Sequence, residues 1–376
     1  MGKELSTNQC LMILNGLPNV GPCVYKTLAK HFPDIRDVFH AGKASLETLP
    51  GIGQVVADTI VNHEKFFNLE KEEQELYEME AQFWGCQHPK FPKLLTQIYD
   101  VPIGMYGLGD NFCENKPKIA IVGSRDATAY GMTIAHRLAF ELAQQGICIV
   151  SGLARGIDSS AHEGALTGGG RTIAVLGSGL DVIYPQENNL LYHKIVANGG
   201  VLSEFVFGRR ADKQTFPCRN RLISGLCDAL IVVESDIHGG SMITAKHAID
   251  QGRHVFAVPG RIDQRSSAGC LALLKAGASI IRDIDDLFDE IPYLNTSRQP
   301  LLPFGENENK PKAPTINCPV GKKIYDILSN SSPLDFDSLA NFIEVPVQTV
   351  ATSAQFLEIH GCIERLYDGK IRIKKA

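Results

Sequence analysis

Residues 151–158, with the sequence SGLARGID, combine a turn of small residues with a permanently charged side chain. They follow an apolar run that predicts a buried strand, and they lead into a predicted helix. Backbone N–H groups at such a turn can bind an anion, since Gly152 and Gly156 permit close approach and Arg155 offers a planar guanidinium to phosphate. Asp158 is placed to cap the helix. A tight turn with a solvated arginine would have the same residues, so other features of the chain must distinguish an anion-binding turn from a purely structural one.

Four other turns rich in glycine, serine or basic residues follow predicted strands, at residues 123–125, 177–181, 213–221 and 234–244. Because ligands on a parallel sheet bind at the carboxyl ends of its strands, we expect these turns to converge on one cleft. Phe216 would offer a surface on which a base can stack. Arginines, a lysine and an aromatic ring beside glycine-rich turns suit a single-stranded nucleic acid. The basic residues that convergence would gather are Arg125, Arg155, Lys213, Arg219 and Arg221.

The elements that must position these turns alternate between short apolar strands and helices. Continuous apolar strands with helices between them predict a parallel sheet covered on both faces, which is an α/β, extended Rossmann-like, doubly wound fold. Residues 83–110 are rich in proline and glycine, so we expect them to supply an edge element. The expected strands lie at residues 118–122, 147–150, 172–176, 201–203, 229–233, 254–258 and 279–281, and the expected helices at residues 130–145, 158–166, 187–197, 242–251 and 271–276.

The N-terminal part is predicted to be helical, in a SAM-like arrangement that resembles a helix-hairpin-helix module. A Gly-apolar-Gly turn at Gly51 and Gly53 precedes an apolar-periodic helix at residues 54–62. In such a module the hairpin offers N–H groups to a DNA phosphate, which would make these glycines a secondary DNA contact. A helical packing module with the same turn geometry is equally compatible with the residues. Residues 64–80 predict a charged, solvated connecting helix.

The C-terminal part predicts a small separate domain after a polar, proline-bearing linker. Three helices and a two-stranded hairpin make a winged helix, but its third helix carries no Lys or Arg, so we expect protein contact rather than duplex reading. The expected elements are helices at residues 321–329, from Asp335 and after Pro346, then strands at residues 363–367 and 370–374 around a turn at residues 368–369. The predicted division is a helical domain at residues 1–80, a Rossmann-like domain at 81–292, a linker at 293–319 and a winged-helix domain at 320–376.

Composition restricts the class of protein. The 376 residues are 44% hydrophobic and 21% charged, with a net charge of −5, so any nucleic-acid contact must be a local basic patch. The ten cysteines form no Cys-x-x-Cys and no zinc spacing, which suits reduced thiols in the cytoplasm. Neither a P-loop nor a Gly-x-Gly-x-x-Gly turn is present in the sequence. We therefore expect a cytoplasmic protein without cofactor, metal or membrane contact.

The ordered motifs resemble those of the bacterial DNA-processing protein family DprA, also called Smf, at residues 123–125, 151–158, 181–185, 203–204, 216–221, 241–245 and 257–260. The resemblance implies single-stranded DNA binding that protects incoming DNA, loading of the RecA recombinase during natural transformation, homodimerisation and no catalytic step. Leu271 and His238 differ from the residues that the family motifs usually have at these positions. By motif position, DNA and phosphate binding falls to Gly123, Ser124, Arg125, Ser151, Gly152, Arg155, Gly156, Lys213, Phe216, Arg219, Asn220 and Arg221.

An alternative is a nucleotide-binding hydrolase of the phosphoribohydrolase type. Glu234, followed by a Gly-Gly-Ser turn and Thr244, is similar to the signature loop of those enzymes. The proline of that signature and the glutamate after the threonine are missing, so the carboxylate needed beside the ribose is absent from the motif. We expect Glu234 and Asp181 to anchor loops by accepting backbone N–H bonds.

Overall fold

The computed structural model describes residues 5–109, 112, 116–294, 319–329, 334–359, 363–365 and 370–373. The chain forms two compact units, Met1–Gln299 and Pro300–Ala376, and each is described by itself. None of the helices in the described part of the chain is long and apolar enough to cross a membrane.

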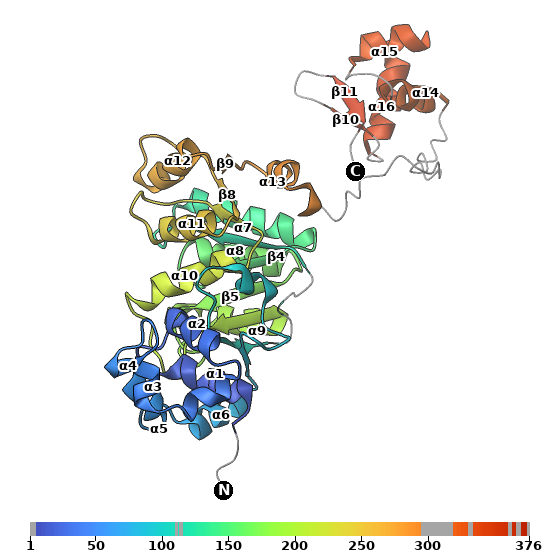
Figure 1. Ribbon diagram of the computed structural model, residues 1–376. Helices are drawn as coiled ribbons and strands as arrows, with labels where there is room; N and C mark the ends of the chain where they lie inside the picture. Colours follow the sequence, from blue (N-terminus) through green and yellow to red (C-terminus); the bar gives the residue numbers. More distant parts are fainter. Residues whose placement is uncertain are drawn as a thin grey trace. The chain divides into compact units, whose positions relative to one another are not determined.

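The first unit is built on a nine-stranded sheet with the order β1-β2-β6-β5-β4-β3-β7-β8-β9. Figure 1 labels β4, β5, β8 and β9 of this sheet. The strands from β6 to β9 in this order are parallel, whereas β1 and β2 pair antiparallel at one edge. The predicted parallel sheet and its added edge element are therefore confirmed. The bounds are β1 (Gln82–Gly85), β2 (Gly104–Leu108), β3 (Lys118–Val122), β4 (Cys148–Ser151), β5 (Thr172–Leu176), β6 (Gly199–Ser203), β7 (Ala229–Val232), β8 (His254–Ala257) and β9 (Ser279–Ile280).

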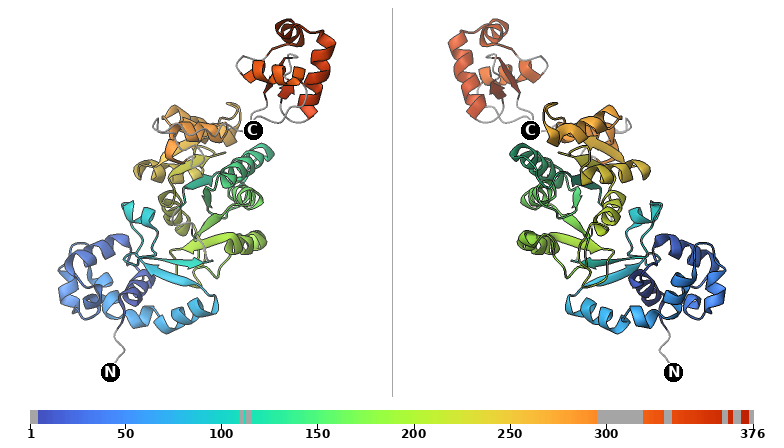
Figure 2. Two further views of the ribbon diagram at one scale, coloured as in Figure 1. Left: turned by 90° about the vertical axis from the view of Figure 1, so that its right-hand side faces the viewer. Right: turned by 90° about the vertical axis from the view of Figure 1, so that its left-hand side faces the viewer.

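Helices cover both faces of this sheet (Figure 2). In β3, Ile119 and Ile121 pack in the same core cluster as Leu138, while Val122 packs with Leu222 in another, because successive strand residues point to opposite faces. The doubly wound α/β class is thus confirmed. One set of helices comprises α7 (Ala129–Gln144), α8 (Ile157–Thr167), α9 (Asn189–Asn198) and α13 (Ile284–Glu290), and the other α10 (Thr215–Gly225), α11 (Gly240–Asp250) and α12 (Ala268–Lys275). Short 3-10 turns are η1 (Ile35–Phe39), η2 (Lys93–Gln97), η3 (Gln186–Asn188), η4 (Arg265–Ser267) and η5 (Pro292–Leu294).

Helix α10 corrects the prediction of a turn at residues 213–221. The Asp212 carboxylate accepts hydrogen bonds from the N–H groups of Gln214 (2.7 Å) and Thr215 (2.9 Å), which stabilises the helix start. Pro217 lies in the first turn, where no intrahelical donor is required. Arg219 and Arg221 therefore project from a helix, and its rotation sets their directions, whereas Lys213 lies before the helix start.

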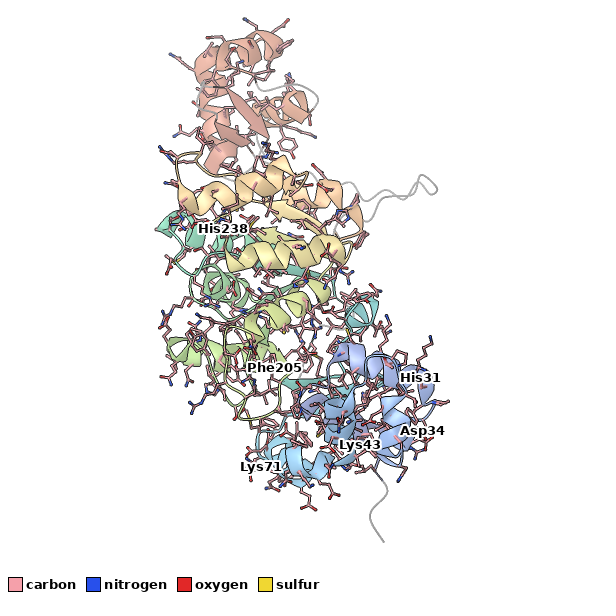
Figure 3. The ribbon with its side chains drawn as sticks, turned by 60° about the vertical axis from the view of Figure 1, so that its left-hand side comes forward. His31, Asp34, Lys43, Lys71, Phe205 and His238 are labelled. Carbon is pink, nitrogen blue, oxygen red and sulfur yellow. The ribbon has the colours of Figure 1, made fainter. Side chains whose placement is uncertain are left out.

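The N-terminal helices share a hydrophobic core with the α/β sheet. Leu11 and Phe83, among others, belong to one buried cluster, and the Asn15 side chain donates to the Glu204 carbonyl oxygen at 2.7 Å. The charged segment is two helices rather than one, and it is not wholly solvated, since buried Glu72 accepts from the Phe207 N–H at 3.1 Å. Figure 3 labels Lys71, also on this segment. The bounds are α1 (Thr7–Gly16), α2 (Pro22–His31), α3 (Lys43–Glu47), α4 (Gln54–Val61), α5 (His63–Phe66) and α6 (Leu69–Glu78).

The second unit contains three helices and a two-stranded antiparallel sheet around its own core. The Asp335 side chain caps the second helix by accepting from the Ser338 N–H at 2.7 Å. The predicted element order is confirmed, while the winged-helix assignment stays a prediction. The turn at residues 368–369 and most of the linker lie outside the described residues. The bounds are α14 (Pro319–Ser329), α15 (Phe336–Ile343), α16 (Val347–Ile359), β10 (Ile363–Arg365) and β11 (Ile371–Ile373).

Candidate nucleic-acid interface

A cavity of about 400 Å³ lies beyond the carboxyl ends of β3, β4 and β7, which we call the strand-end cavity. The sheet order explains its position, because β3 lies between β4 and β7 and the turns that follow these strands meet there. The N-terminal parts of α10 and α11 complete the wall. The lining residues are Val122, Gly123, Ser124, Arg125, Ala154, Asp158, Lys213, Phe216, Pro217, Arg219, Asn220, Ile223, Ser235, Asp236, Gly239, Gly240, Ser241, Ile243 and Thr244.

Twelve residues were predicted from the sequence to bind DNA or phosphate. Seven of them line this cavity, namely Gly123, Ser124, Arg125, Lys213, Phe216, Arg219 and Asn220. Five others are not among its lining residues: Ser151, Gly152, Arg155, Gly156 and Arg221. The turn at residues 177–181 does not line it either, although Gly177 lies against the Phe216 ring. The five turns thus converge only in part.

The Phe216 ring is half-buried and lies between cationic and aromatic neighbours. The Arg125 guanidinium carbon lies 4.5 Å from the ring centroid, and that of Arg219 lies 5.9 Å from it. The Tyr184 ring, half exposed, is 5.7 Å away. Cations over an aromatic face are attracted by its quadrupole, so this arrangement joins positive charge to a flat apolar surface.

Arg125 and Lys213 are the exposed cations of the cavity wall. Within the described residues neither forms an ion pair with a carboxylate. Their charges are therefore available to an anion that enters from solvent.

Arg219, in contrast, is buried and bound to the protein backbone. Its Nη1 donates to the carbonyl oxygens of Gly152 at 2.5 Å and Val175 at 2.7 Å, while Nε has no hydrogen-bond partner among the described residues. Burial lowers the pKa of Arg219 to about 10, although the nearby Asp158 carboxylate acts in the opposite direction. The guanidinium remains protonated at neutral pH and connects the ends of β4 and β5.

The turn before α8 is held in place by the carboxylate of Asp158. Asp158 lies within the first turn of α8 and accepts from the N–H groups of Gly152 (3.2 Å) and Ala154 (3.4 Å), so it fastens the preceding turn instead of capping the helix as predicted. Gly156 has φ of +73°, and a Cβ there would lie 2.5 Å from the Ser124 carbonyl oxygen. Close approach of two turns is thus the reason for glycine at this position.

Two predicted arginines have protein partners elsewhere. Arg155 is exposed and pairs with Glu187, with Nη2 2.8 Å from Oε2. Arg221 is buried, and its guanidinium binds Glu204 at 2.6 Å and Asp100 at 3.1 Å. This arginine therefore joins α10 to the segment that follows β6 and to the segment that precedes β2. The structure does not bring it to the cavity.

The carboxylates proposed as loop anchors have that role. Glu234 accepts from the Thr128 N–H at 2.9 Å and from the Thr128 hydroxyl at 2.6 Å, and Asp181 accepts from the Gly208 N–H at 2.9 Å. Both predictions are confirmed. The two carboxylates that line the cavity are also engaged, Asp158 as described above and Asp236 with Arg265.

Sequence reasoning assigned no binding residue to the turn and helix start at residues 235–244, which form one wall of the cavity. The Asn220 side chain donates to the Gly240 carbonyl oxygen at 3.2 Å and so joins this wall to α10. The sequence feature that could have indicated this wall is the Gly-Gly-Ser turn, which comes directly after a predicted strand. His238, labelled in Figure 3, lies on this turn.

In the helix-hairpin-helix part, Gly51 has φ of +79° and Gly53 precedes α4 as its N-cap. The space around both is open, since a Cβ at either would meet no atom of the described part of the chain within 4 Å. Lys43, labelled in Figure 3, lies nearby but pairs with Asp58 at 3.0 Å. Across the residues that the structure describes, no cluster of His, Cys, Asp and Glu side chains could hold a metal ion.

Comparison with known proteins agrees with this architecture. Residues 82–292 match the family described as DNA recombination-mediator protein A, and residues 11–75 match the helix-hairpin-helix motif. Protein Smf from Synechocystis sp. is 32% identical over 92% of this chain and 94% of its own length. The DNA processing protein DprA from Streptococcus pneumoniae is 41% identical over 54% of this chain and 72% of its own length.

Two solved structures are also similar. The X-ray structure of DprA from Streptococcus pneumoniae has a TM-score of 0.67 and 32% identity, covering 77% of this chain and 99% of that one. A structure of DNA processing protein A from Helicobacter pylori, which concerns its single-stranded DNA binding mode, has a TM-score of 0.52 and 33% identity over 57% of this chain and 97% of that one. The chain belongs to the DNA recombination-mediator protein A family and has that family's role in DNA processing.

Proposed function

We propose that the strand-end cavity binds single-stranded DNA. The observation that carries this proposal is the stacking of Arg125 on the Phe216 ring at 4.5 Å, beside exposed Lys213, in a cavity whose carboxylates are engaged. A single strand offers unpaired bases to an aromatic face and phosphates to cations. The single-stranded DNA binding of the similar Helicobacter pylori protein supports the same ligand.

The predicted site residues divide into those that contact DNA and those that hold the contacting residues in place. Gly123, Ser124, Arg125, Lys213, Phe216 and Asn220 line the cavity and contact DNA. Arg219 lines it too, and its buried guanidinium also fixes the turn at Gly152. Ser151 and Gly156 shape that turn, Arg155 borders it while paired to Glu187, and Arg221 holds α10 in place. Gly51 and Gly53 form a secondary DNA contact.

Membership of the family supports a wider role, which is part of the same proposal. The chain acts in the cytoplasm as a homodimer that protects incoming single strands and loads the RecA recombinase onto them during natural transformation, without catalysing a reaction. In this proposal residues 81–292 form the DNA-binding domain, residues 1–80 a helical accessory domain, residues 293–319 a linker, and residues 320–376 a winged-helix domain that contacts protein.

The test is fluorescence anisotropy of a labelled oligo-dT titrated with the full chain, with unlabelled duplex as competitor. We expect tight, salt-sensitive binding that prefers single strands and weakens strongly in Arg125→Ala. Arg282→Ala, which removes an exposed arginine paired with Asp286 away from the cavity, is the matched control. Binding that is indifferent to Arg125 would reject the site.

A second assay separates DNA binding from recombinase loading. RecA ATP hydrolysis on single strands coated with single-strand binding protein should start sooner when the wild-type chain is added. If the chain bound oligo-dT but did not shorten this lag, the DNA site would stand and the loading role would not. Release of free base from a nucleoside monophosphate would instead support the phosphoribohydrolase alternative.

A further inference from the structure

A second cavity lies at the amino ends of the parallel strands of the same sheet. It has a volume of about 380 Å³ and is bordered by Lys118 at the start of β3, Ile173 near the start of β5 and Asp228 just before β7. We call it the amino-edge cavity. Since the strand-end cavity lies at the carboxyl ends of these parallel strands, the two cavities are separated by the length of the strands.

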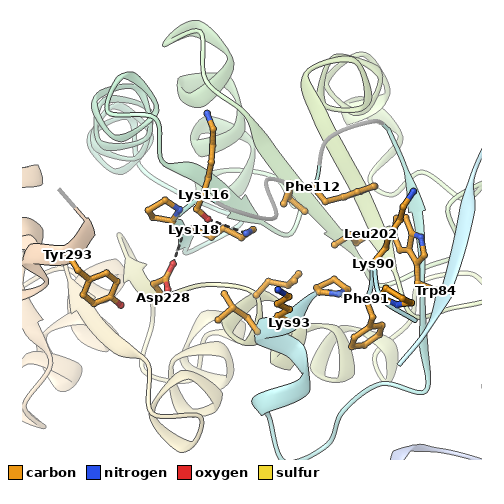
Figure 4. A pocket seen from close by; sticks show the side chains of 16 residues that line it. Trp84, Lys90, Phe91, Lys93, Phe112, Lys116, Lys118, Leu202, Asp228 and Tyr293 are labelled. Atoms are coloured by element: carbon orange, nitrogen blue, oxygen red, sulfur yellow. Dashed lines mark hydrogen bonds between the residues drawn. The ribbon is translucent and has the colours of Figure 1, made fainter. Parts of the chain in front are cut away.

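The wall of the amino-edge cavity is mostly apolar and aromatic. Trp84 and Phe91 are nearly fully buried and come from β1 and from the proline-bearing segment before η2. Phe112 packs edge-on against Trp84, with ring centroids 5.1 Å apart. Figure 4 shows these three rings at one end of the cavity and Tyr293 at the other. Such a wall accepts a flat apolar body.

Four lysines and one carboxylate are found among the described residues that line this cavity. Lys90 and Lys93 are exposed at the rim, and Figure 4 shows Lys93 between the aromatic ends. Buried Lys118 directs its ammonium to the Lys116 carbonyl oxygen at 3.2 Å. The Asp228 carboxylate already accepts from the Lys118 backbone N–H at 2.9 Å. Lysines therefore outnumber carboxylates four to one among the described lining residues, in a chain whose net charge is −5.

We infer that the amino-edge cavity binds a small anionic ligand with a flat, apolar body. A volume near 380 Å³ falls within the range of small-molecule sites, which is roughly 300–1,000 Å³. The aromatic wall receives the apolar body, and Lys90 and Lys93 attract the anionic group at the rim. The site is independent of the proposed DNA site, because it lies at the other end of the strands and shares none of its lining residues.

The test uses a property of the sequence, since Trp84 is the single tryptophan of the chain. Anilinonaphthalene sulfonate combines aromatic rings with an anion, and energy transfer from Trp84 to the dye reports dye bound in the vicinity of Trp84. The charge substitutions and the competition described below assign that binding to this cavity. We expect saturable energy transfer with the wild-type chain. N-phenylnaphthylamine has a similar aromatic body without charge and shows how much the anion contributes.

The doubly substituted variant Lys90→Glu/Lys93→Glu changes only exposed side chains, so the fold is retained. It should weaken binding of the sulfonate dye about five- to tenfold, as expected for two exposed charge contacts, and leave the neutral dye unchanged. Lys26→Glu/Lys30→Glu on α2 is the matched control and should change neither. Absence of saturable transfer from Trp84, or equal weakening by both pairs of substitutions, would overturn the inference.

Competition with oligo-dT distinguishes this site from the proposed DNA site. Oligo-dT should leave the energy transfer from Trp84 unchanged, and the Arg125→Ala variant should bind the dye normally. Displacement of the dye by oligo-dT would show that the cavity belongs to the path of the nucleic acid and would overturn an independent small-ligand site. Failure of DNA binding with retained dye binding would reject the proposed function alone.

Discussion

The Arg219 guanidinium lies directly against the backbone of Gly152. Its Nη1 donates to the Gly152 carbonyl oxygen at 2.5 Å, and a Cβ on Gly152 would lie only 1.9 Å from that nitrogen. A side chain assigned to DNA by its motif is therefore also part of the scaffold that shapes the turn. Loss of DNA binding on its substitution has two possible causes, and stability must be measured beside affinity.

Arg219→Ala should lower the free energy of unfolding by about 3–5 kcal/mol, because it leaves the buried Asp158 carboxylate without its nearby cation and two carbonyl oxygens without a donor. Urea unfolding followed by circular dichroism measures the change. Arg282→Ala, at an exposed pair, should cost less than about 1 kcal/mol. Equal stability of the two variants would contradict a scaffold role for Arg219.

Phe216→Leu should weaken oligo-dT binding by about 1–3 kcal/mol, because leucine keeps apolar volume but offers no aromatic face to a base. Anisotropy titration measures the affinity. Tyr77→Leu removes an exposed aromatic ring of α6 and serves as the control, with no expected effect. If Phe216→Leu bound as tightly as the wild type, base stacking on this ring would be wrong.

Arg125→Ala and Lys213→Ala should each reduce the salt dependence of binding. Neutralising one phosphate contributes about 0.7 to the slope of log affinity against log salt for single strands. The double variant should therefore lose about 1.4. Titrations at four or more salt concentrations measure this slope. Lys194→Ala, at an exposed position of α9, should leave it unchanged, and an unaltered slope in the double variant would place the phosphates elsewhere.

His162 should make the fold sensitive to acid. It is fully buried, its Nδ1 lies 2.7 Å from the Thr172 hydroxyl oxygen, and burial lowers its pKa to about 3. Because the unfolded chain binds a proton near pH 6.5 and the folded chain does not, the free energy of unfolding falls as pH drops below that value. The slope approaches about 1.4 kcal/mol per pH unit.

Urea unfolding at several pH values between 7 and 4 tests this, with His162→Gln as the comparison, since glutamine does not titrate. The variant should lose less stability than the wild type across this window. Parallel stability curves for the two proteins would show that His162 does not control the acid response.

The sequence alone determined the layered architecture and much of the candidate site. Apolar runs such as residues 118–122 and 172–176 predicted parallel strands correctly, because only a sheet covered on both faces accepts continuous apolar strands. The sheet then required the turn after β3 and the segment with Phe216 to lie at one edge. The anchoring roles of Glu234 and Asp181 were also predictable, because a carboxylate beside exposed N–H groups accepts hydrogen bonds.

Tertiary structure decided which basic residues face the cavity. Arg219 and Arg221 are two positions apart, and because a helix rotates by about 100° per residue, their side chains point in nearly opposite directions. One faces Gly152 and the cavity, while the other binds Glu204 and Asp100. The sequence predicted a turn at these residues, and a turn does not fix the angle between two side chains in this way. The amino-edge cavity likewise depends on tertiary packing, because Trp84, Lys118 and Tyr293 are distant in the chain and only the fold brings them together.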